Sequence, residues 1–460
     1  MFNRMINFNK FKISLVLLIA LVILIISFST RFMNEDPLFS GSEFYNDIDI
    51  SKDLSQEIFW SNLQEKEHSI NLSHYILSFL DSDYSIILVS LILGLISTYI
   101  FFLLVKFFSQ NQDVALFSTI LFVISPAFIF LFTRLNSLTI SFFFTLIFFY
   151  LYIKKNWLSL IPIILVATSN FAVLCVDLVI VLIYHFTEEK KLFFFVNTLI
   201  GLAAGLSFIF LNKYFFNSLL FETPSLVLFL TEFGAPIGLS FFNLFLALIG
   251  FSIIWKRKPE FILFLSLLFI LFLFSMVNPV GRIFFNLFAS FLCASAILFF
   301  SNRVWALISI KRFTLLLVLC GVLFGSVSYI DQLSNAAPHA ELVMALDFLK
   351  TQDPGKVISY ESNGFLIQHF AGFQSFIDGS ENFENYIKLK DVEQKIFFSR
   401  NLESTNNLLQ ENKIKYFVIT KEMQSGLVWK KQGEGILFLL ENSDSFKEIY
   451  NSKGVIIWRH

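Results

Sequence analysis

Five polar residues, far apart in the sequence, are of types that can bind a metal ion or a phosphate group. Asp36 and Glu232 are carboxylates, Arg134 and Arg282 are guanidinium groups, and Asn136 follows Arg134 by two residues. Carboxylates can hold a hard divalent cation, and arginine matches the geometry of phosphate with paired donors. Each also has a plainer interpretation, as a turn residue or as an anchor near lipid headgroups. Their chemistry depends on the elements that position them.

The composition is typical of a membrane protein. Hydrophobic residues make up 56% of the chain and charged residues only 15%, which lies outside the usual range of soluble domains. The net charge of -1 provides no basic field, so we expect no nucleic-acid partner. Cys175, Cys293 and Cys320 all lie in apolar runs, which argues against a disulfide framework.

About eleven segments are apolar enough to cross a bilayer, which takes roughly 20 residues for an untilted helix. The expected spans cover residues 12–28, 84–105, 114–132, 138–153, 157–168, 171–186, 192–211, 236–254, 260–277, 283–300 and 313–330. Only Ser169 and Asn170 separate the fifth from the sixth, so one long span is an alternative there. The sixth contains Asp177, and an acidic residue at such a depth is usually paired or functional.

Lysine and arginine decide the orientation, because short loops rich in these residues stay in the cytoplasm. With eleven spans, basic pairs such as Lys154-Lys155 and Lys311-Arg312 lie inside. We therefore expect a multi-pass protein of the cell membrane, with a cytoplasmic N-terminus and an extracytoplasmic chain after Asp331. The five polar residues then all face the outer side. Merging the fifth and sixth spans would reverse this result.

Two regions lie outside the expected bilayer. Residues 31–83 form an acidic outer loop, in which residues 50–64 have the spacing of an amphipathic surface helix. From about residue 335 the hydropathy falls and helical patterns alternate with apolar runs, which favours a small α/β domain. The helical patterns cover 340–351 and 402–412, and the runs cover 356–360, 365–370, 373–377, 416–420 and 455–458. We thus expect a transmembrane domain at 1–333, loop included, and a soluble domain at 334–460.

The order of these features resembles the C-type (GT-C) superfamily of membrane glycosyltransferases, above all the catalytic subunit of the archaeal oligosaccharyltransferase. In that family an Asp-Pro pair follows the first span, as Asp36-Pro37 does here. An outer loop later ends near a glutamate, and a span, a basic turn, a span and an arginine-aromatic run follow. Glu232, the basic residues 256–258 and Arg282 keep this order. The resemblance implies a helical membrane protein with an outer α/β domain.

The resemblance also implies an activity, which is transfer of a sugar or glycan from a polyprenyl phosphate or pyrophosphate to an acceptor outside the cell. Asp36 would bind a divalent metal, Mg²⁺ or Mn²⁺, and orient the acceptor, while Glu232 shares the metal. Arg282 and Arg134 would stabilise the departing lipid phosphate. The expected partners are the bilayer, the lipid-linked donor, and an acceptor that is a protein, a lipid or a glycan.

Two motifs of that family are altered in this chain. The second outer loop of the family carries an acidic metal ligand, where this sequence has Asn136, whose carbonyl oxygen is a weaker, neutral ligand. The acceptor-binding motif of the tail, Trp-Trp-Asp-Tyr-Gly, corresponds to the stretch that contains Tyr360 and Gly364, and only Gly364 is retained. Tyr360 and Gly364 remain the implied acceptor contacts. Two alternatives follow: an inactive scaffold or lipid-carrier binder of the same fold, and a transporter, for which Asp177 is the supporting residue.

Overall fold

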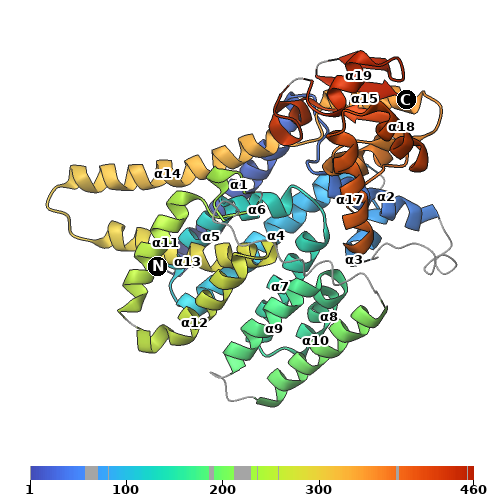
Figure 1. The fold of residues 1–460 in the computed structure, drawn as a ribbon. Helices are drawn as coiled ribbons and strands as arrows, with labels where there is room; N and C mark the ends of the chain where they lie inside the picture. Colours follow the sequence, from blue (N-terminus) through green and yellow to red (C-terminus); the bar gives the residue numbers. More distant parts are fainter. Residues whose placement is uncertain are drawn as a thin grey trace. The chain divides into compact units, whose positions relative to one another are not determined.

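The chain divides into two compact units in the computed structural model (Figure 1). The structure describes residues 2–56, 71–80, 82–185, 191–211, 229–235, 237–256, 258–379, 383–431, 433–452 and 454–460. Unit 1 comprises Met1–Arg31 and Leu54–Ser334, and unit 2 comprises Phe32–Asp53 and Asn335–His460. The first part of the outer loop, which the sequence analysis grouped with the transmembrane domain, therefore packs with the C-terminal part of the chain.

Unit 1 is built from helices. They are α1 (Phe2–Met33), α3 (Leu72–Ser78), α4 (Asp83–Ser109), α5 (Gln112–Val123), α6 (Pro126–Phe132), α7 (Ser137–Ile153), α8 (Leu160–Ser169), α9 (Phe171–His185), α10 (Lys191–Leu211), α11 (Phe241–Trp255), α12 (Lys258–Ser275), α13 (Pro279–Asn302) and α14 (Ile308–Ser334). Within the described ranges, α1, α4, α13 and α14 are long and apolar enough to cross a membrane, and the bent pair α5–α6 makes a fifth candidate. The other apolar helices have 10–17 residues. Every segment expected as a span falls on one of these apolar helices.

The third expected span, residues 114–132, is not one straight helix. It is broken into α5 and α6, which are bent by 64°. Ser125 lies at the break in an extended conformation, as expected for a residue before a proline, and Pro126 opens α6. The hydroxyl of Ser125 accepts a hydrogen bond from the N–H of Phe128 at 3.3 Å, so the new helix begins with a capped first turn.

Helices α8 and α9 are two separate helices, so the alternative of one long span is wrong. Asn170 between them is extended, with φ −154° and ψ 117°. The hydroxyl of Thr145, halfway along α7, donates to the carboxylate of Asp177 in α9 at 2.7 Å. A Cβ at Gly201 of α10 would lie 2.8 Å from Ile163 of α8 and 3.3 Å from Leu178 of α9, so these two residues lie side by side although fifteen positions separate them. Helix α9 therefore turns back, and Asp177 has a hydrogen-bond partner inside the bundle.

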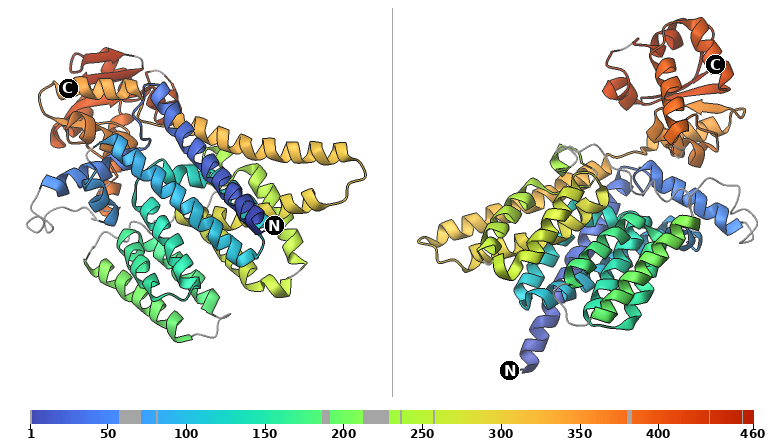
Figure 2. Two further views of the ribbon diagram at one scale, coloured as in Figure 1. Left: turned by 180° about the vertical axis from the view of Figure 1, so that it is seen from behind. Right: turned by 60° about the horizontal axis from the view of Figure 1, so that its bottom comes forward.

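Helices approach each other closely at two glycines of unit 1. Helices α1 and α4 run side by side (Figure 2), and a Cβ at Gly94 of α4 would lie only 2.9 Å from Leu24 of α1. Helices α11 and α13 approach even more closely, because a Cβ at Gly250 would lie 2.0 Å from the carbonyl oxygen of Leu292. Gly250 has no room for a side chain because it faces backbone, whereas a Cβ at Gly94 would require the end of the Leu24 side chain to move.

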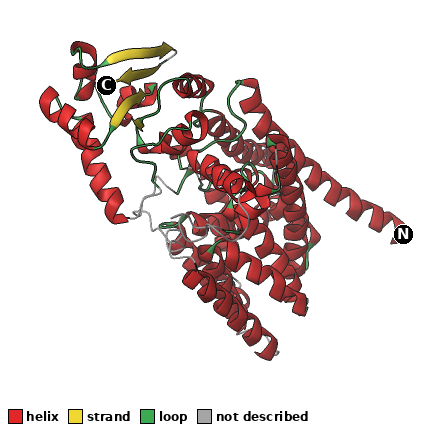
Figure 3. Ribbon diagram, turned by 90° about the vertical axis from the view of Figure 1, so that its right-hand side faces the viewer, coloured by secondary structure: helices red, strands yellow, loops and turns green. Residues whose placement is uncertain are grey.

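Unit 2 combines a small sheet with short helices (Figure 3). Its helices are α2 (Ser42–Gln56, of which 42–53 belong to this unit), α15 (Ala340–Lys350), α16 (Gly364–Leu366), α17 (Phe383–Phe397), α18 (Leu402–Glu411) and α19 (Ile436–Asn442). Its strands are β1 (Lys356–Ile358), β2 (Ile414–Ile419), β3 (Lys447–Ser452) and β4 (Val455–Arg459). The expected surface helix at 50–64 overlaps the end of α2, whereas residues 57–64 lie outside the described residues.

The sheet is mixed, with strand order β1-β2-β4-β3. Strands β1 and β2 are parallel, while β4 pairs antiparallel with both β2 and β3. The apolar run at 365–370 is helical rather than extended, because it lies in α16 and the following π-helical turn Ile367–Ala371. Trp429 is fully buried in the core beside the sheet, where its indole N–H donates to the carbonyl of Phe397 at 2.9 Å.

Substituting Gly250 with Ala should destabilise unit 1. The added methyl group must displace the backbone of α13 at Leu292, and overpacking of this kind costs about 1–3 kcal/mol. The melting temperature of the purified protein should therefore fall. Ser252→Ala is the matched control on the exposed face of the same helix and should change it little. Equal melting temperatures for Gly250→Ala and the control would contradict the close contact.

Candidate functional site

Glu232 lies in a short 3₁₀ turn, Thr231–Phe233, ahead of α11. Both of its carboxylate oxygens accept from the backbone N–H of Phe241, the first residue of α11, at 3.1 Å each. Ser240, the residue before the helix, makes no capping hydrogen bond with its own side chain. Glu232 therefore acts as the cap of α11, where a negative charge is also favoured by the helix dipole.

The loop that carries Glu232 is fixed to helix α13. The side-chain amide of Asn286 donates to the carbonyl of Gly238 in the loop, at 2.9 Å, and to the carbonyl of Arg282 in the helix, at 3.1 Å. Within the loop, Leu239 donates to Phe229 at 2.9 Å, so its two arms lie against each other. Arg282 lies one turn before Asn286 on the same helix. The side chain of Asn286 therefore connects the loop to the backbone at Arg282.

Three arginines lie near the ends of the helices of unit 1. Arg282, in the first turn of α13, and Arg31, near the end of α1, are each 1% exposed. Arg31 donates to the carbonyl of Leu333 in α14 at 2.9 Å. Arg134 follows α6 and stacks over the ring of Phe130, with 4.9 Å to its centroid. A buried guanidinium is costly unless it is compensated, so such groups inside a membrane bundle are candidates for function.

Arg31 is a candidate that the sequence analysis missed. An arginine at the end of an apolar helix is expected to extend toward the membrane surface. The sequence contains no signal of its burial, because the partner carbonyl of Leu333 lies 302 positions away. Helix α6 contacts both α13 and α14, and the 3₁₀ turn with Glu232 contacts α14. These contacts bring the ends of α1, α6, α13 and α14 into one region of unit 1.

Asn136 is the capping residue of α7. Its side-chain oxygen accepts from the N–H of Thr139 at 3.0 Å. The Thr139 hydroxyl donates to the carbonyl of Arg134 at 2.7 Å, which fixes the loop between α6 and α7. The amide oxygen that the sequence suggested as a metal ligand is therefore engaged by the first turn of its own helix, and the loop positions Arg134.

Asp36 belongs to unit 2 and has a similar role there. It follows Glu35, whose φ of 59° lies in the left-handed region. One carboxylate oxygen of Asp36 accepts from the N–H of Ala340, the first residue of α15, at 2.8 Å, and the other lies 3.5 Å from Nδ1 of His339. The Asp36 side chain is 8% exposed. Asp36, which the sequence resemblance implies as a metal ligand, thus caps a helix that begins 304 positions later in the chain.

A second contact ties the same loop to the C-terminal part of unit 2. Nδ1 of His369 lies 2.7 Å from the carboxylate of Asp49 in α2. The ring of Tyr45 packs against His369 and Phe370, with centroid distances of 4.9 and 5.2 Å. Together with the Asp36 contact, this pair makes residues 32–53 an integral part of unit 2.

Tyr360 lies beside a network of charged side chains. Lys390 of α17 places its ammonium 4.9 Å from the Tyr360 ring centroid and forms ion pairs with Glu361 at 2.9 Å and Glu393 at 2.7 Å. Tyr386 donates to the same Glu361 oxygen at 2.6 Å. This hydrogen bond and burial raise the pKa of Tyr386 to about 12, and burial raises the pKa values of Tyr360 and Glu393.

Gly364 is needed for packing. A Cβ at this position would lie 2.4 Å from Cα of Asp378, so the two chain segments touch through their backbones. The side-chain amide of Gln368 donates to the carboxylate of Asp378 and closes the same contact. The retained glycine of the tail motif therefore joins two parts of unit 2 that the sequence separates by fourteen positions.

The structure groups the predicted residues by unit. Glu232, Arg282, Arg134 and Asn136 belong to unit 1, and Asp36, Tyr360 and Gly364 belong to unit 2. Within unit 2, Tyr360 and Gly364 flank one short turn, while Asp36 contacts the start of α15. Among the residues that the structure describes, no group of three or more His, Cys, Asp or Glu side chains is arranged to hold a metal ion.

Comparison with known proteins identifies the fold. No protein family and no curated protein matches the sequence. The archaeal oligosaccharyltransferase AglB from Archaeoglobus fulgidus, in complex with an inhibitory peptide and a dolichol-phosphate, is similar with a TM-score of 0.61 and 12% identity, over 98% of this chain and 74% of that chain. The Archaeoglobus fulgidus oligosaccharyltransferase in complex with Zn and sulfate gives 0.56 and 13%, over 95% and 72%. Over nearly its whole length, this chain has the fold of an archaeal oligosaccharyltransferase, as the sequence resemblance predicted.

The Tyr386 hydrogen bond predicts a loss of stability at alkaline pH. The folded-state pKa of about 12 exceeds the ordinary value of 10.0, so the unfolded chain loses this proton first. The stabilisation is complete below pH 10 and should disappear as the pH rises toward 12. The melting temperature of Tyr386→Phe should therefore fall less between pH 9 and 11 than the melting temperature of wild type.

Glu361→Gln provides the control for this assignment. The substitution removes the negative charge of the group that accepts the Tyr386 hydrogen bond, so the pKa of Tyr386 should fall toward its ordinary value. The tyrosinate absorbance of the variant, compared with the same variant carrying Tyr386→Phe, reports this single group. An unchanged Tyr386 titration in Glu361→Gln would mean that Glu361 is not the cause.

Proposed function

We propose that this protein is a membrane glycosyltransferase that moves a sugar or glycan from a polyprenyl phosphate or pyrophosphate to an extracytoplasmic acceptor. The observation that carries the proposal is the likeness of fold to an archaeal oligosaccharyltransferase, at a TM-score of 0.61 over 98% of the chain. The order of Asp36-Pro37, Glu232 and Arg282 along the sequence supports it independently. The Archaeoglobus fulgidus protein was solved with a dolichol-phosphate, a ligand of the proposed class.

The proposal includes a topology with eleven spans. An odd number of spans would put the N-terminus and unit 2 on opposite sides of the membrane, and the distribution of lysine and arginine assigns the N-terminus to the cytoplasm. The separate helices α8 and α9 support the odd number, because the Thr145–Asp177 hydrogen bond requires the chain to turn back between them. Several helices have fewer than 18 residues, so tilting or local thinning of the bilayer has to accommodate them.

The lipid phosphate is the part of the substrate that unit 1 is best suited to bind. Arg282 and Arg134 carry fixed positive charge, and buried Arg31 adds a third guanidinium in the same region. A guanidinium stabilises the negative charge that develops on a departing phosphate more strongly in a desolvated site than in water. We assign the three arginines to the phosphate of the donor, and the turn with Tyr360 and Gly364 to the acceptor.

A divalent cation, Mg²⁺ or Mn²⁺, is assigned to Asp36 and Glu232 from the sequence motifs alone. Such an ion would supply positive charge beside a phosphate group. The described residues do not by themselves fit a metal site, since no group of three or more His, Cys, Asp or Glu side chains is arranged around either carboxylate. The Zn-bound Archaeoglobus fulgidus structure supports a metal in a protein of this fold.

A protein of the same fold that binds the lipid carrier without catalysis is the second candidate. Two observations favour it: both candidate carboxylates cap helices, and the second outer loop offers only the amide of Asn136, which is itself a cap. Such a protein would keep the arginines for lipid phosphate and lose the transfer step.

Asp36→Asn separates the capping role from the catalytic role. The amide oxygen of asparagine can still accept from Ala340, so the melting temperature should stay near that of wild type, whereas Asp36→Ala should lower it. If Asp36 serves the reaction through its charge, Asp36→Asn should reduce release of glycan from a polyprenyl-diphosphate-linked donor by about 100-fold or more. Full activity in the asparagine variant would reduce Asp36 to a helix cap.

A metal titration tests the two candidate ligands without relying on activity. Mn²⁺ should raise the melting temperature of the wild type, since a ligand that binds only the folded state stabilises it. Asp36→Asn and Glu232→Gln, which both retain a capping oxygen, should each abolish that increase. Stabilisation that survives in both variants would remove these residues as ligands. No stabilisation of folded wild type would favour the binding-only candidate.

A further inference from the structure

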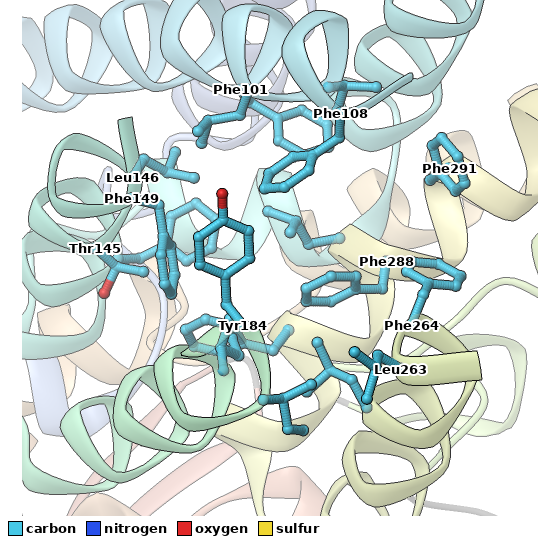
Figure 4. A pocket seen from close by; sticks show the side chains of 18 residues that line it. Phe101, Phe108, Thr145, Leu146, Phe149, Tyr184, Leu263, Phe264, Phe288 and Phe291 are labelled. Carbon is cyan, nitrogen blue, oxygen red and sulfur yellow. The ribbon is translucent and has the colours of Figure 1, made fainter. Parts of the chain in front are cut away.

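Unit 1 contains an apolar cavity of about 290 Å³ between α4, α7, α9, α12 and α13 (Figure 4). Sixteen of the eighteen side chains that line it are Phe, Leu, Ile or Val. The two others are Thr145 and Tyr184. The Thr145 hydroxyl donates to Asp177 at 2.7 Å and in Figure 4 points away from the cavity, whereas the Tyr184 hydroxyl points among the rings. The cavity is therefore suited to a hydrocarbon ligand.

The size of the cavity fits a segment of a lipid chain. An engineered apolar cavity of about 150 Å³ stays free of water and binds benzene, so a cavity about twice as large accommodates roughly ten to twelve carbon atoms. The lining residues of α13 run from Phe284 to Phe291, which corresponds to about 10 Å along the helix. This volume and this length together match an extended alkyl segment better than a compact polar metabolite.

The lining of the cavity is buried at one end and exposed at the other. Phe142 and Phe284, each almost fully buried, contact each other at the buried end with their centroids 6.1 Å apart. At the other end Phe108, which is 58% exposed, contacts Tyr184 with a centroid distance of 6.3 Å. Phe108 and Tyr184 lie in the last turns of α4 and α9, so a chain enters from the side where these helices end.

Two lysines lie at the ends of α4 and α7 on this side of unit 1, outside the lining of the cavity. Lys106 is exposed in the last turn of α4, two residues before Phe108. Lys154 is exposed at the end of α7, where its ammonium lies 4.3 Å from the Tyr150 ring centroid. Cationic side chains next to a membrane surface attract anionic lipid headgroups. They lie at the opposite ends of α4 and α7 from Ser82 and Arg134, and so away from the arginines assigned to the donor.

We propose that the cavity binds one acyl chain of an anionic phospholipid, whose phosphate is held by Lys106 and Lys154. The lipid comes from the leaflet on the side where α4, α7 and α9 end. It fills the space between α4, α9 and α13 and stabilises their packing. This proposal is independent of glycosyl transfer, because an inactive protein of the same fold would bind the lipid in the same way.

Photocrosslinking in nanodiscs tests the site. The full-length protein is reconstituted with phosphatidylglycerol that carries a diazirine on one acyl chain, irradiated, and mapped by peptide mass spectrometry. We expect labelling of peptides from α4, α9 and α13. Leu287→Trp fills the cavity and should reduce this labelling at least fivefold, while Leu182→Trp, on an exposed position of α9 outside the cavity, should not. Val105→Phe is a second filling variant if Leu287→Trp does not fold.

Further controls test the role of the lipid headgroup and whether the bound hydrocarbon chain is an acyl chain. Lys106→Ala combined with Lys154→Ala should reduce labelling, the corresponding double arginine variant should restore it, and a diazirine phosphatidylcholine should label less than the anionic lipid. Equal labelling of wild type and Leu287→Trp, or of the two lipids, would overturn the proposal. Displacement of the label by equimolar polyprenyl phosphate would also overturn it, since the occupant would then be an isoprenoid chain.

Discussion

The N–H groups in the first turn of each helix must find acceptors, and this requirement governs where the polar side chains of the protein lie. Hydrocarbon offers no water to replace a missing partner. Several helices are capped by the residue directly before them, among them α5, α6, α7 and α13 by Asn111, Ser125, Asn136 and Asn278. Helices α11 and α15 instead take their acceptor from Glu232 and Asp36, which come from other parts of the chain. Capping thus accounts for contacts of three residues that the sequence presents as candidates for chemistry.

Capping and chemistry are compatible at these positions. A carboxylate has about four acceptor sites, and one helix N–H uses only one or two of them. The hydrogen bond also holds the side chain in a single orientation, which a ligand or a general base needs. Hydrogen bonds also fix the segments that carry the arginines. The side chain of Asn286 joins the backbone at Arg282 to the Glu232 loop, and the Thr139 hydroxyl binds the carbonyl of Arg134. These hydrogen bonds fix the loops that carry Glu232 and Arg134 and the first turn of α13.

Features that depend on local sequence could be predicted, and features that depend on distant contacts could not. Hydropathy located every apolar helix, because a helix in a bilayer is specified by its own residues. The break at Ser125-Pro126 could have been predicted from the sequence, since proline favours the first position of a new helix. No local pattern, however, signals that Arg31 is buried against Leu333 or that Asp36 caps α15. The charged network around Tyr360 likewise arises only when α17 folds onto the turn that contains Glu361.

The composition of unit 2 has a consequence for biosynthesis. Its first part, Phe32–Asp53, leaves the ribosome early, whereas the helix that Asp36 caps begins 304 residues later. At a translation rate of about 5–20 residues per second, the early segment waits roughly 15–60 s for its partner. During that interval the aromatic side chains of Phe39, Phe44 and Tyr45, which are buried in the finished protein, have no C-terminal partner to cover them. Residues 32–53 therefore cannot complete unit 2 until residues 335–460 have been synthesised.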